Sequence, residues 1–144
     1  FYERATLRLA QERWDEALND IQAALRIDSL NETYWVTRGI VYEKQRQWRK
    51  ALRDYERAIQ LNDQWPEAWF HHGNAARRLN QRTTAIEDYT MAIFLKSDYG
   101  NAYYNRAIMH YETGNYLHAC ADLQKAAALK VAINPKLKQK VCAK

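Results

Sequence analysis

The chain has 144 residues, of which 47% are hydrophobic and 27% are charged, and its formal net charge is +5. This composition is ordinary for a folded protein and argues against disorder. No apolar run approaches the roughly 20 residues that a membrane-spanning helix needs. The 22 Lys and Arg residues are interspersed with 17 Asp and Glu residues, which argues against a nucleic-acid-binding surface.

Several residue types recur along the chain at intervals of 34 residues. Alanine recurs at Ala17, Ala51, Ala85 and Ala119, and again at Ala24, Ala58, Ala92 and Ala126. An aromatic residue recurs at Phe1, Trp35, Trp69 and Tyr103, and a small residue at Ala5, Gly39, Gly73 and Ala107. A period in the range of about 20 to 50 residues indicates stacked supersecondary units.

Each period contains two stretches of helical spacing with a short polar break between them. In chain order, we expect helical hairpins over about 1–31, 32–65, 66–99 and 100–133, all within a single domain. A final helix over 134–144 is expected to cap the stack, because its lysines would face water. The chain lacks an initiating Met and begins partway into a period, so we expect it to be a fragment of a longer protein.

The breaks between paired helices carry the turn signals of helical hairpins. Asn80 and Gly114 stand where a left-handed residue would end the first helix, and Glu12 and Arg46 occupy the same place at some conformational cost. Pro66 is expected to open a helix, where its missing N–H costs nothing.

Two charged positions recur as well. Acids stand at Asp20, Asp54, Asp88 and Asp122, and bases at Arg4, Arg38, His72 and Arg106. We expect a ladder of ion pairs between neighbouring helices, in which the His72 rung would respond to pH.

Enzymatic chemistry finds little support in the sequence. There is no phosphate-binding glycine loop, no metalloprotease motif, no nucleophile elbow and no CxxC pair. His71 and His72 point to different sides of one helix, and His110 and His118 belong to different helices. We therefore expect no catalytic residue, no metal, no cofactor and no small-molecule substrate.

The recurring residues resemble the tetratricopeptide repeat. The resemblance rests on Trp35, Gly39, Tyr42, Ala51, Tyr55 and Ala58, followed by Trp69, Gly73, Ala85, Tyr89 and Ala92. It implies an all-α, right-handed α-solenoid of about four antiparallel hairpins plus the capping helix. It also implies a scaffold that binds a protein or peptide. The sequence departs from the family where Ser29, Asp63, Ser97 and Val131 replace its usual proline.

In this family the first helices line a concave groove, which is the usual binding surface. Carried onto this chain, the groove would include Val36, Ile40, Lys44, Phe70, His71, Asn74, Arg77, Arg78, Asn101, Tyr104, Asn105, Ile108 and Tyr111. Aromatic rings would grip side chains of an extended peptide, the amides of Asn74 and Asn105 would bind its backbone, and Arg77 and Arg78 would contact anions.

Other interpretations of these residues remain open. The aromatic groove residues could instead pack between helices, and the arginines could form a solvated face. Asn74 and Asn105 match the family's carboxylate clamp for chaperone tails, but Phe70, Pro135 and Gln139 replace its basic residues. Self-assembly of the chain into a homo-oligomer is an alternative function, and nucleic-acid binding a lesser one.

The two cysteines are placed where a disulfide could hold the capping helix against the last repeat. Cys120 and Cys142 each lie about eleven residues from a break near residue 131, so antiparallel packing would bring them to one level. The segment from Ala119 to Ala127, followed by a later Cys, resembles the last repeat of some bacterial tetratricopeptide proteins. A bridge would imply a periplasmic or extracellular protein, whereas two separate thiols would suit the cytoplasm.

Overall fold

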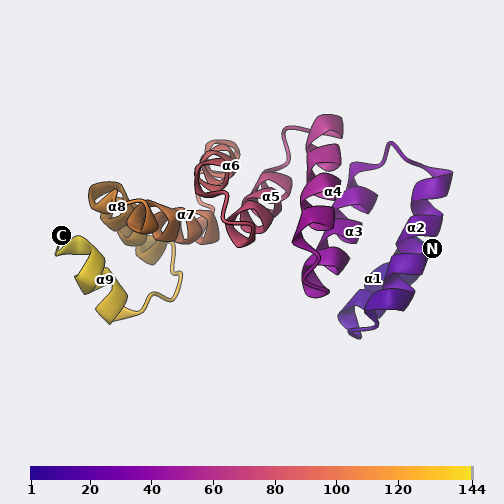
Figure 1. Cartoon of the computed structure of the whole chain (residues 1–144), viewed down its shortest axis with the longest axis horizontal. Helices are drawn as coiled ribbons and strands as arrows, with labels where there is room; N and C mark the ends of the chain where they lie inside the picture. The colour runs from indigo at the N-terminus through magenta and orange to yellow at the C-terminus, as the bar shows by residue number, and fades with distance from the viewer. Residues whose placement is uncertain (144) are drawn as a thin grey trace.

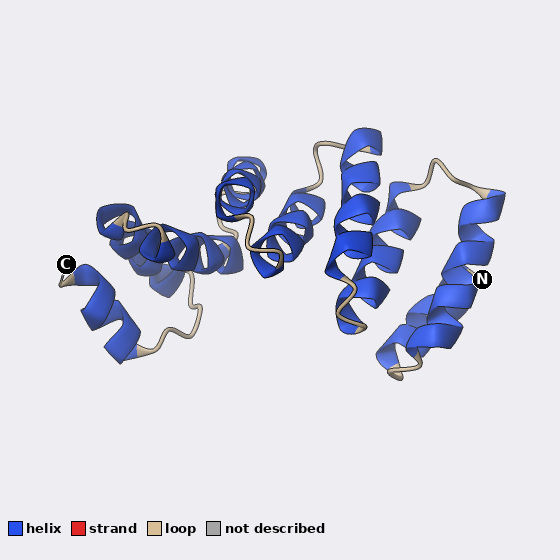
Figure 2. Cartoon of the chain, in the orientation of Figure 1, coloured by secondary structure: helices blue, strands red, loops and turns tan. Residues whose placement is uncertain are grey.

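The computed structural model describes residues 1–143, and every regular element in that range is a helix (Figure 2). The helices are α1 (Tyr2–Ala10), α2 (Trp14–Ile27), α3 (Glu32–Lys44), α4 (Trp48–Leu61), α5 (Pro66–Arg78), α6 (Arg82–Leu95), α7 (Gly100–Glu112), α8 (Tyr116–Ala128) and α9 (Pro135–Cys142). None of them is both long enough and apolar enough to cross a bilayer.

The helices pair into antiparallel hairpins that stack from one end of the molecule to the other (Figure 1). Each helix packs chiefly on the next one in the chain, and α1, α3, α5 and α7 also contact one another in sequence. The helix axes turn along the stack, from nearly upright at α2 and α4 to nearly horizontal at α8 in this view. The chain is thus an all-α solenoid of helical hairpins, as the sequence predicted.

Small residues let the two helices of a hairpin approach closely. A Cβ atom added at Gly39 would lie 2.5 Å from Cε1 of Tyr55, and one added at Gly73 would lie 2.9 Å from Cε1 of Tyr89. Both tyrosine rings are fully buried. The recurring glycine and the recurring tyrosine are therefore one packing contact, repeated in consecutive hairpins.

The expected left-handed turns are confirmed. The φ angle is 60° at Glu12, 58° at Arg46, 63° at Asn80 and 80° at Gly114. In each turn a backbone N–H beyond the first helix returns to that helix, for example from Gln47 to the carbonyl of Tyr42. These bonds satisfy carbonyl groups that the helix end would otherwise leave unpaired.

The recurring tryptophan ties the second and third hairpins to the loops before them. Nε1 of Trp35 donates to the carbonyl oxygen of Ser29 at 2.8 Å, and Nε1 of Trp69 donates to that of Asp63 at 2.8 Å. These acceptors are the positions where the sequence lacks the family's proline. The side chain therefore fixes a loop that would otherwise have more backbone freedom.

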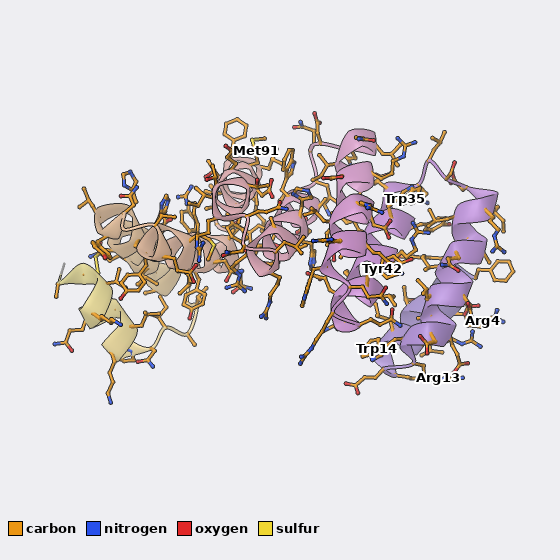
Figure 3. All side chains as sticks on the ribbon, viewed as in Figure 1. Arg4, Arg13, Trp14, Trp35, Tyr42 and Met91 are labelled. Atoms are coloured by element: carbon orange, nitrogen blue, oxygen red, sulfur yellow. A yellow bond between two sulfur atoms is a disulfide. The ribbon has the colours of Figure 1, made fainter. Side chains whose placement is uncertain are left out.

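The predicted ion-pair ladder is present, and each pair forms within one hairpin. Nε of Arg38 lies 2.8 Å from Oδ2 of Asp54, and Nε of Arg106 lies 2.8 Å from Oδ2 of Asp122. Near the N-terminus, Nη2 of Arg4 (Figure 3) lies 2.6 Å from Oδ1 of Asp20. All four ladder aspartates are buried, so each one depends on its cationic partner.

The third rung differs because its base is a histidine. Nδ1 of His72 lies 2.6 Å from Oδ2 of Asp88, and its Nε2 lies 3.7 Å from Oε1 of Glu56. Burial by itself would lower the pKa of His72, but the two carboxylates outweigh burial and raise it. This rung therefore carries a charge that depends on pH.

The last helix, α9, packs on α8 at the C-terminal end of the stack. Val141 is buried against Ala107, Ala119 and Leu123, and Leu137 packs against the same cluster. A disulfide joins Cys120 on α8 to Cys142 on α9. Lys144, the last residue of the predicted cap, lies outside the described residues.

Candidate functional site

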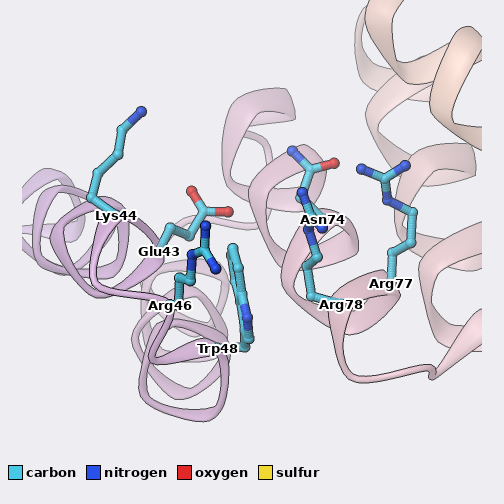
Figure 4. Close-up of a pocket in the computed structure, with 7 residues that line it drawn as sticks. All are labelled: Glu43, Lys44, Arg46, Trp48, Asn74, Arg77 and Arg78. Atoms are coloured by element: carbon cyan, nitrogen blue, oxygen red, sulfur yellow. The ribbon is translucent and has the colours of Figure 1, made fainter.

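A hollow lies between α3 and α5, where the two first helices meet the turn that leads into α4. Figure 4 shows it as an open groove with side chains converging from both sides. Its volume is about 520 Å³. The residues that line this α3–α5 groove are Glu43, Lys44, Arg46, Trp48, Asn74, Arg77 and Arg78.

Four of these residues belong to the predicted groove set. Lys44 and Arg78 are exposed, whereas Asn74 and Arg77 are partly buried. The structure thus brings the three predicted cations together with Asn74 at one place on the first helices. Ligand binding at this place remains a prediction.

Asn74 and Asn105 are hydrogen-bonded to each other across α5 and α7. Oδ1 of Asn74 accepts from Nδ2 of Asn105 at 2.9 Å and from the hydroxyl of Tyr89 at 2.8 Å. These two bonds fix the amide of Asn74, and its Nδ2 group has no acceptor among residues 1–143. In Figure 4 the amide of Asn74 stands between Glu43 and Arg77.

The predicted aromatic contact Phe70 is largely a packing residue. Its ring centroid lies 4.9 Å from that of Tyr99 and 5.9 Å from that of Tyr89, and the side chain packs on the core around Tyr89. Part of the ring is still accessible. This arrangement favours packing between helices over a free gripping surface.

Other predicted groove residues also bury part of their side chains against the core. Val36 is only 4% exposed and belongs to the core around Tyr55, so it offers almost nothing to a ligand. Ile40 and Ile108 are partly buried against neighbouring core clusters. Asn101, at the start of α7, is exposed.

At the C-terminal end, the capping helix covers part of the same surface. Tyr104 and Tyr111 pack on the cluster that contains Val141 of α9. Nζ of Lys140, also on α9, lies 5.5 Å from the ring centroid of Tyr111. A ligand along α7 could therefore contact Tyr104 and Tyr111 only where α9 does not cover them.

His71 faces α3. Its Nδ1 lies 3.3 Å from Oε2 of Glu43, and its ring stacks on that of Tyr55 with centroids 5.5 Å apart. Burial raises the pKa of Tyr55, and the carboxylate of Glu43 raises it further, so this phenol is neutral. Within residues 1–143 no cluster of His, Cys, Asp or Glu is placed to hold a metal ion.

Sequence reasoning missed three residues of the α3–α5 groove, namely Glu43, Arg46 and Trp48. Arg46 was assigned only to a turn, yet its side chain points into the groove (Figure 4). Trp48, the first residue of α4, forms a wall, and Cζ of Arg78 lies 5.3 Å from its ring centroid. One signal was available: an arginine in a left-handed position is unusual enough to call for a reason.

Family models agree with this architecture. A model described as tetratricopeptide repeat matches residues 32–65, and a second model of the same description matches residues 70–135. The chain belongs to the tetratricopeptide repeat family. Membership supports a protein-interaction scaffold in general terms, since this repeat is a non-enzymatic scaffold. No curated protein matches the sequence.

Solved structures of tetratricopeptide repeat proteins share the fold. A crystal structure of MamA is 21% identical, with a TM-score of 0.83 over 88% of this chain and 74% of its own. MamA from Desulfovibrio magneticus RS-1 is 17% identical, with a TM-score of 0.83 over 90% and 73%. A tetratricopeptide repeat protein from Parabacteroides merdae ATCC 43184 is 18% identical, with a TM-score of 0.86 over 98% and 57%. At these identities the likeness concerns the fold alone.

Proposed function

We propose that this chain binds an extended polypeptide segment along the groove formed by its first helices α3, α5 and α7. The observation that carries the proposal is the amide pair of Asn74 and Asn105. With Oδ1 of Asn74 already occupied, the pair offers Nδ2 of Asn74 as a donor and Oδ1 of Asn105 as an acceptor. One donor beside one acceptor complements the C=O and N–H of one extended residue, which point to the same side of the backbone.

The groove also has the mixed character that suits a polypeptide. Partly exposed rings and aliphatic side chains stand beside the amides, and cations gather at the α3–α5 end. A segment held there would bury apolar side chains while pairing its backbone, which is the usual composition of a protein interface. The division of the chain into four repeats and a cap is part of this proposal.

Replacement of Asn74 by Asp tests the donor without removing the acceptor. The variant keeps an oxygen for Tyr89 and Asn105 but loses Nδ2, so a bound peptide carbonyl would face an oxygen. We expect the affinity for a partner captured from a lysate of the source organism to fall by about fivefold or more, in line with a lost hydrogen bond and an unpaired acceptor. Isothermal titration calorimetry with the purified partner gives the measurement.

Replacement of Asn19 by Asp is the matched control, because Asn19 is exposed on α2 and the charge change is identical. If the Asn74 variant and the double variant Asn74→Ala, Asn105→Ala both stay within about twofold of the native affinity, the groove proposal loses its basis. The double variant also leaves Tyr89 without an acceptor, so its fold must be checked by circular dichroism.

Self-assembly is the second candidate function. Phe1 is 60% exposed and Leu7 is 58% exposed, so the surface around α1 presents apolar side chains that another copy could cover. Sedimentation velocity over a wide concentration range distinguishes the two functions: a constant sedimentation coefficient would eliminate self-assembly.

We also infer an oxidising compartment, periplasmic or extracellular, from the bridge between Cys120 and Cys142. Disulfides persist in such compartments and are reduced in the cytosol of most organisms. Mass spectrometry after alkylation of the native protein from its source checks this. Two alkylated cysteines without prior reduction would point to the cytoplasm instead.

A further inference from the structure

The α3–α5 groove holds a surplus of positive charge that the chain itself does not neutralise. Lys44, Arg46, Arg77 and Arg78 all line it, and Glu43 is the only acid among its lining residues. Within residues 1–143, none of the four cations has a carboxylate within 4.0 Å. Four unpaired cations around one hollow make a place where an anion from outside would be attracted.

The rest of the concave and interhelical surface treats its arginines differently. Arg38 and Arg106 each make a bidentate contact with a ladder aspartate, and Arg82 lies 3.1 Å from Glu112. In the α3–α5 groove, by contrast, the carboxylate of Glu43 lies 3.3 Å from Nδ1 of His71 and makes no ion pair with a groove cation. The ladder arginines and Arg82 are thus neutralised within the chain, whereas the cations of this groove are not.

The surroundings of Arg77 and Arg78 constrain their side chains, and the backbone at Arg46 is constrained by its turn. Arg46 projects from a turn residue with φ of 58°, and the backbone around it is closed by the hydrogen bond from Gln47 to Tyr42. The guanidinium of Arg78 stacks on the indole of Trp48, which limits its rotamers. Nε of Arg77 is buried without a hydrogen-bond partner. Such groups lose less freedom when they bind an anion than solvated side chains would.

We propose that the α3–α5 groove binds an acidic stretch of the partner segment, with two or more carboxylates placed among Arg46, Arg77 and Arg78. This inference rests on the proposed function, because the same segment would continue past Asn74 towards α7. Guanidinium groups pair with carboxylates through two parallel hydrogen bonds, and a groove partly shielded from water strengthens them. The site differs from the carboxylate clamp, whose basic positions this chain lacks.

A peptide fits these observations better than a nucleic acid does. The cationic surplus is smaller at the next hollow, which is lined by Arg77, Arg78, Asn80, Arg82 and Glu112, because Arg82 there is paired with Glu112. A single strand needs a continuous basic track and open aromatic faces. The aromatic ring in the groove, Trp48, already carries Arg78 on one face.

Fluorescence anisotropy with three labelled probes tests the proposal. The first probe is an octapeptide with four central glutamates, the second is its glutamine counterpart, and the third is a strand of eight thymidines. The protein variants are the double substitution Arg46→Gln, Arg78→Gln and the matched double substitution Arg53→Gln, Arg57→Gln on α4. Both doubles remove two positive charges, and circular dichroism confirms that both fold.

The glutamate probe should bind at least about fivefold more tightly than the glutamine probe, and the Arg46, Arg78 double should weaken it by about tenfold, which corresponds to about 1.4 kcal/mol. The Arg53, Arg57 double should change it by less than about twofold. Equal binding of both peptides would overturn the acidic preference and leave groove binding intact. Equal weakening by both doubles, no binding of either peptide, or tighter groove-dependent binding of the thymidine strand would also overturn it.

Discussion

Reduction of the disulfide between Cys120 and Cys142 is expected to loosen the capping helix α9 without unfolding the repeats. The bridge spans 22 residues of sequence. In the chain-entropy model, a loop of that length stabilises the closed state by slightly more than the value for a loop of about 15 residues, which is about 3 kcal/mol. Helix α9 has only eight residues, so its apolar contacts through Val141 and Leu137 are few.

The loss should be local because each hairpin contacts chiefly its neighbours. Hydrogen exchange followed by mass spectrometry, with and without a phosphine reductant, resolves this. About 3 kcal/mol corresponds to an increase of roughly a hundredfold in the exchange rate of amides in α9. Amides in α3 to α6 should exchange at unchanged rates.

The variant Cys142→Ser provides the control. Its α9 should exchange quickly in both conditions, and the reductant should have no further effect on it. If α9 kept its protection after reduction, apolar packing alone would hold the cap. If α3 and α4 lost protection as much as α9, the molecule would unfold as one unit, and the reasoning from neighbouring contacts would be wrong.

Two further substitutions test the interior of the solenoid. Replacement of Gly73 by Leu should lower the free energy of unfolding by about 1 to 3 kcal/mol, because even a Cβ atom there meets the buried ring of Tyr89; an unchanged melting temperature would contradict this contact. Replacement of His72 by Arg should remove a pH dependence: with its pKa raised in the folded state, His72 stabilises fully below its unfolded pKa of about 6.5, and this contribution is lost as the pH rises through the folded pKa. Urea midpoints of the native chain should therefore fall relative to those of His72→Arg above pH 6.5. Parallel pH profiles of the two proteins would argue against a pH-dependent pair of His72 and Asp88. So would a pH profile that the substitution Asp88→Asn leaves unchanged.

The repeating part of the fold could be predicted because it follows from positions that recur. A residue that returns every 34 positions meets the same partner in each hairpin, as Gly39 meets Tyr55 and Gly73 meets Tyr89. The ladder likewise joins residues 16 apart in every hairpin. Such contacts are local in sequence, and periodicity is enough to find them.

The groove was harder to predict because its positions change from one hairpin to the next. Which of them face a ligand depends on how far neighbouring hairpins rotate, and that rotation follows from the summed packing of many side chains. Val36 was therefore assigned to the groove although the structure buries it. Arg46 was assigned only to a turn and Trp48 was given no role, although both line the groove. The bond between Asn74 and Asn105 joins two hairpins and left no trace in the spacing.

The central claim is that a partner segment lies along α3, α5 and α7. Hydrogen exchange of the chain with and without its purified partner tests this most directly, because each helix is reported separately. We expect slower exchange in α3, α5 and α7, strongest around Lys44 and Asn74, and no change in α4 and α6. Protection confined to α4 and α6, or to the surface around Phe1 and α1, would contradict the claim.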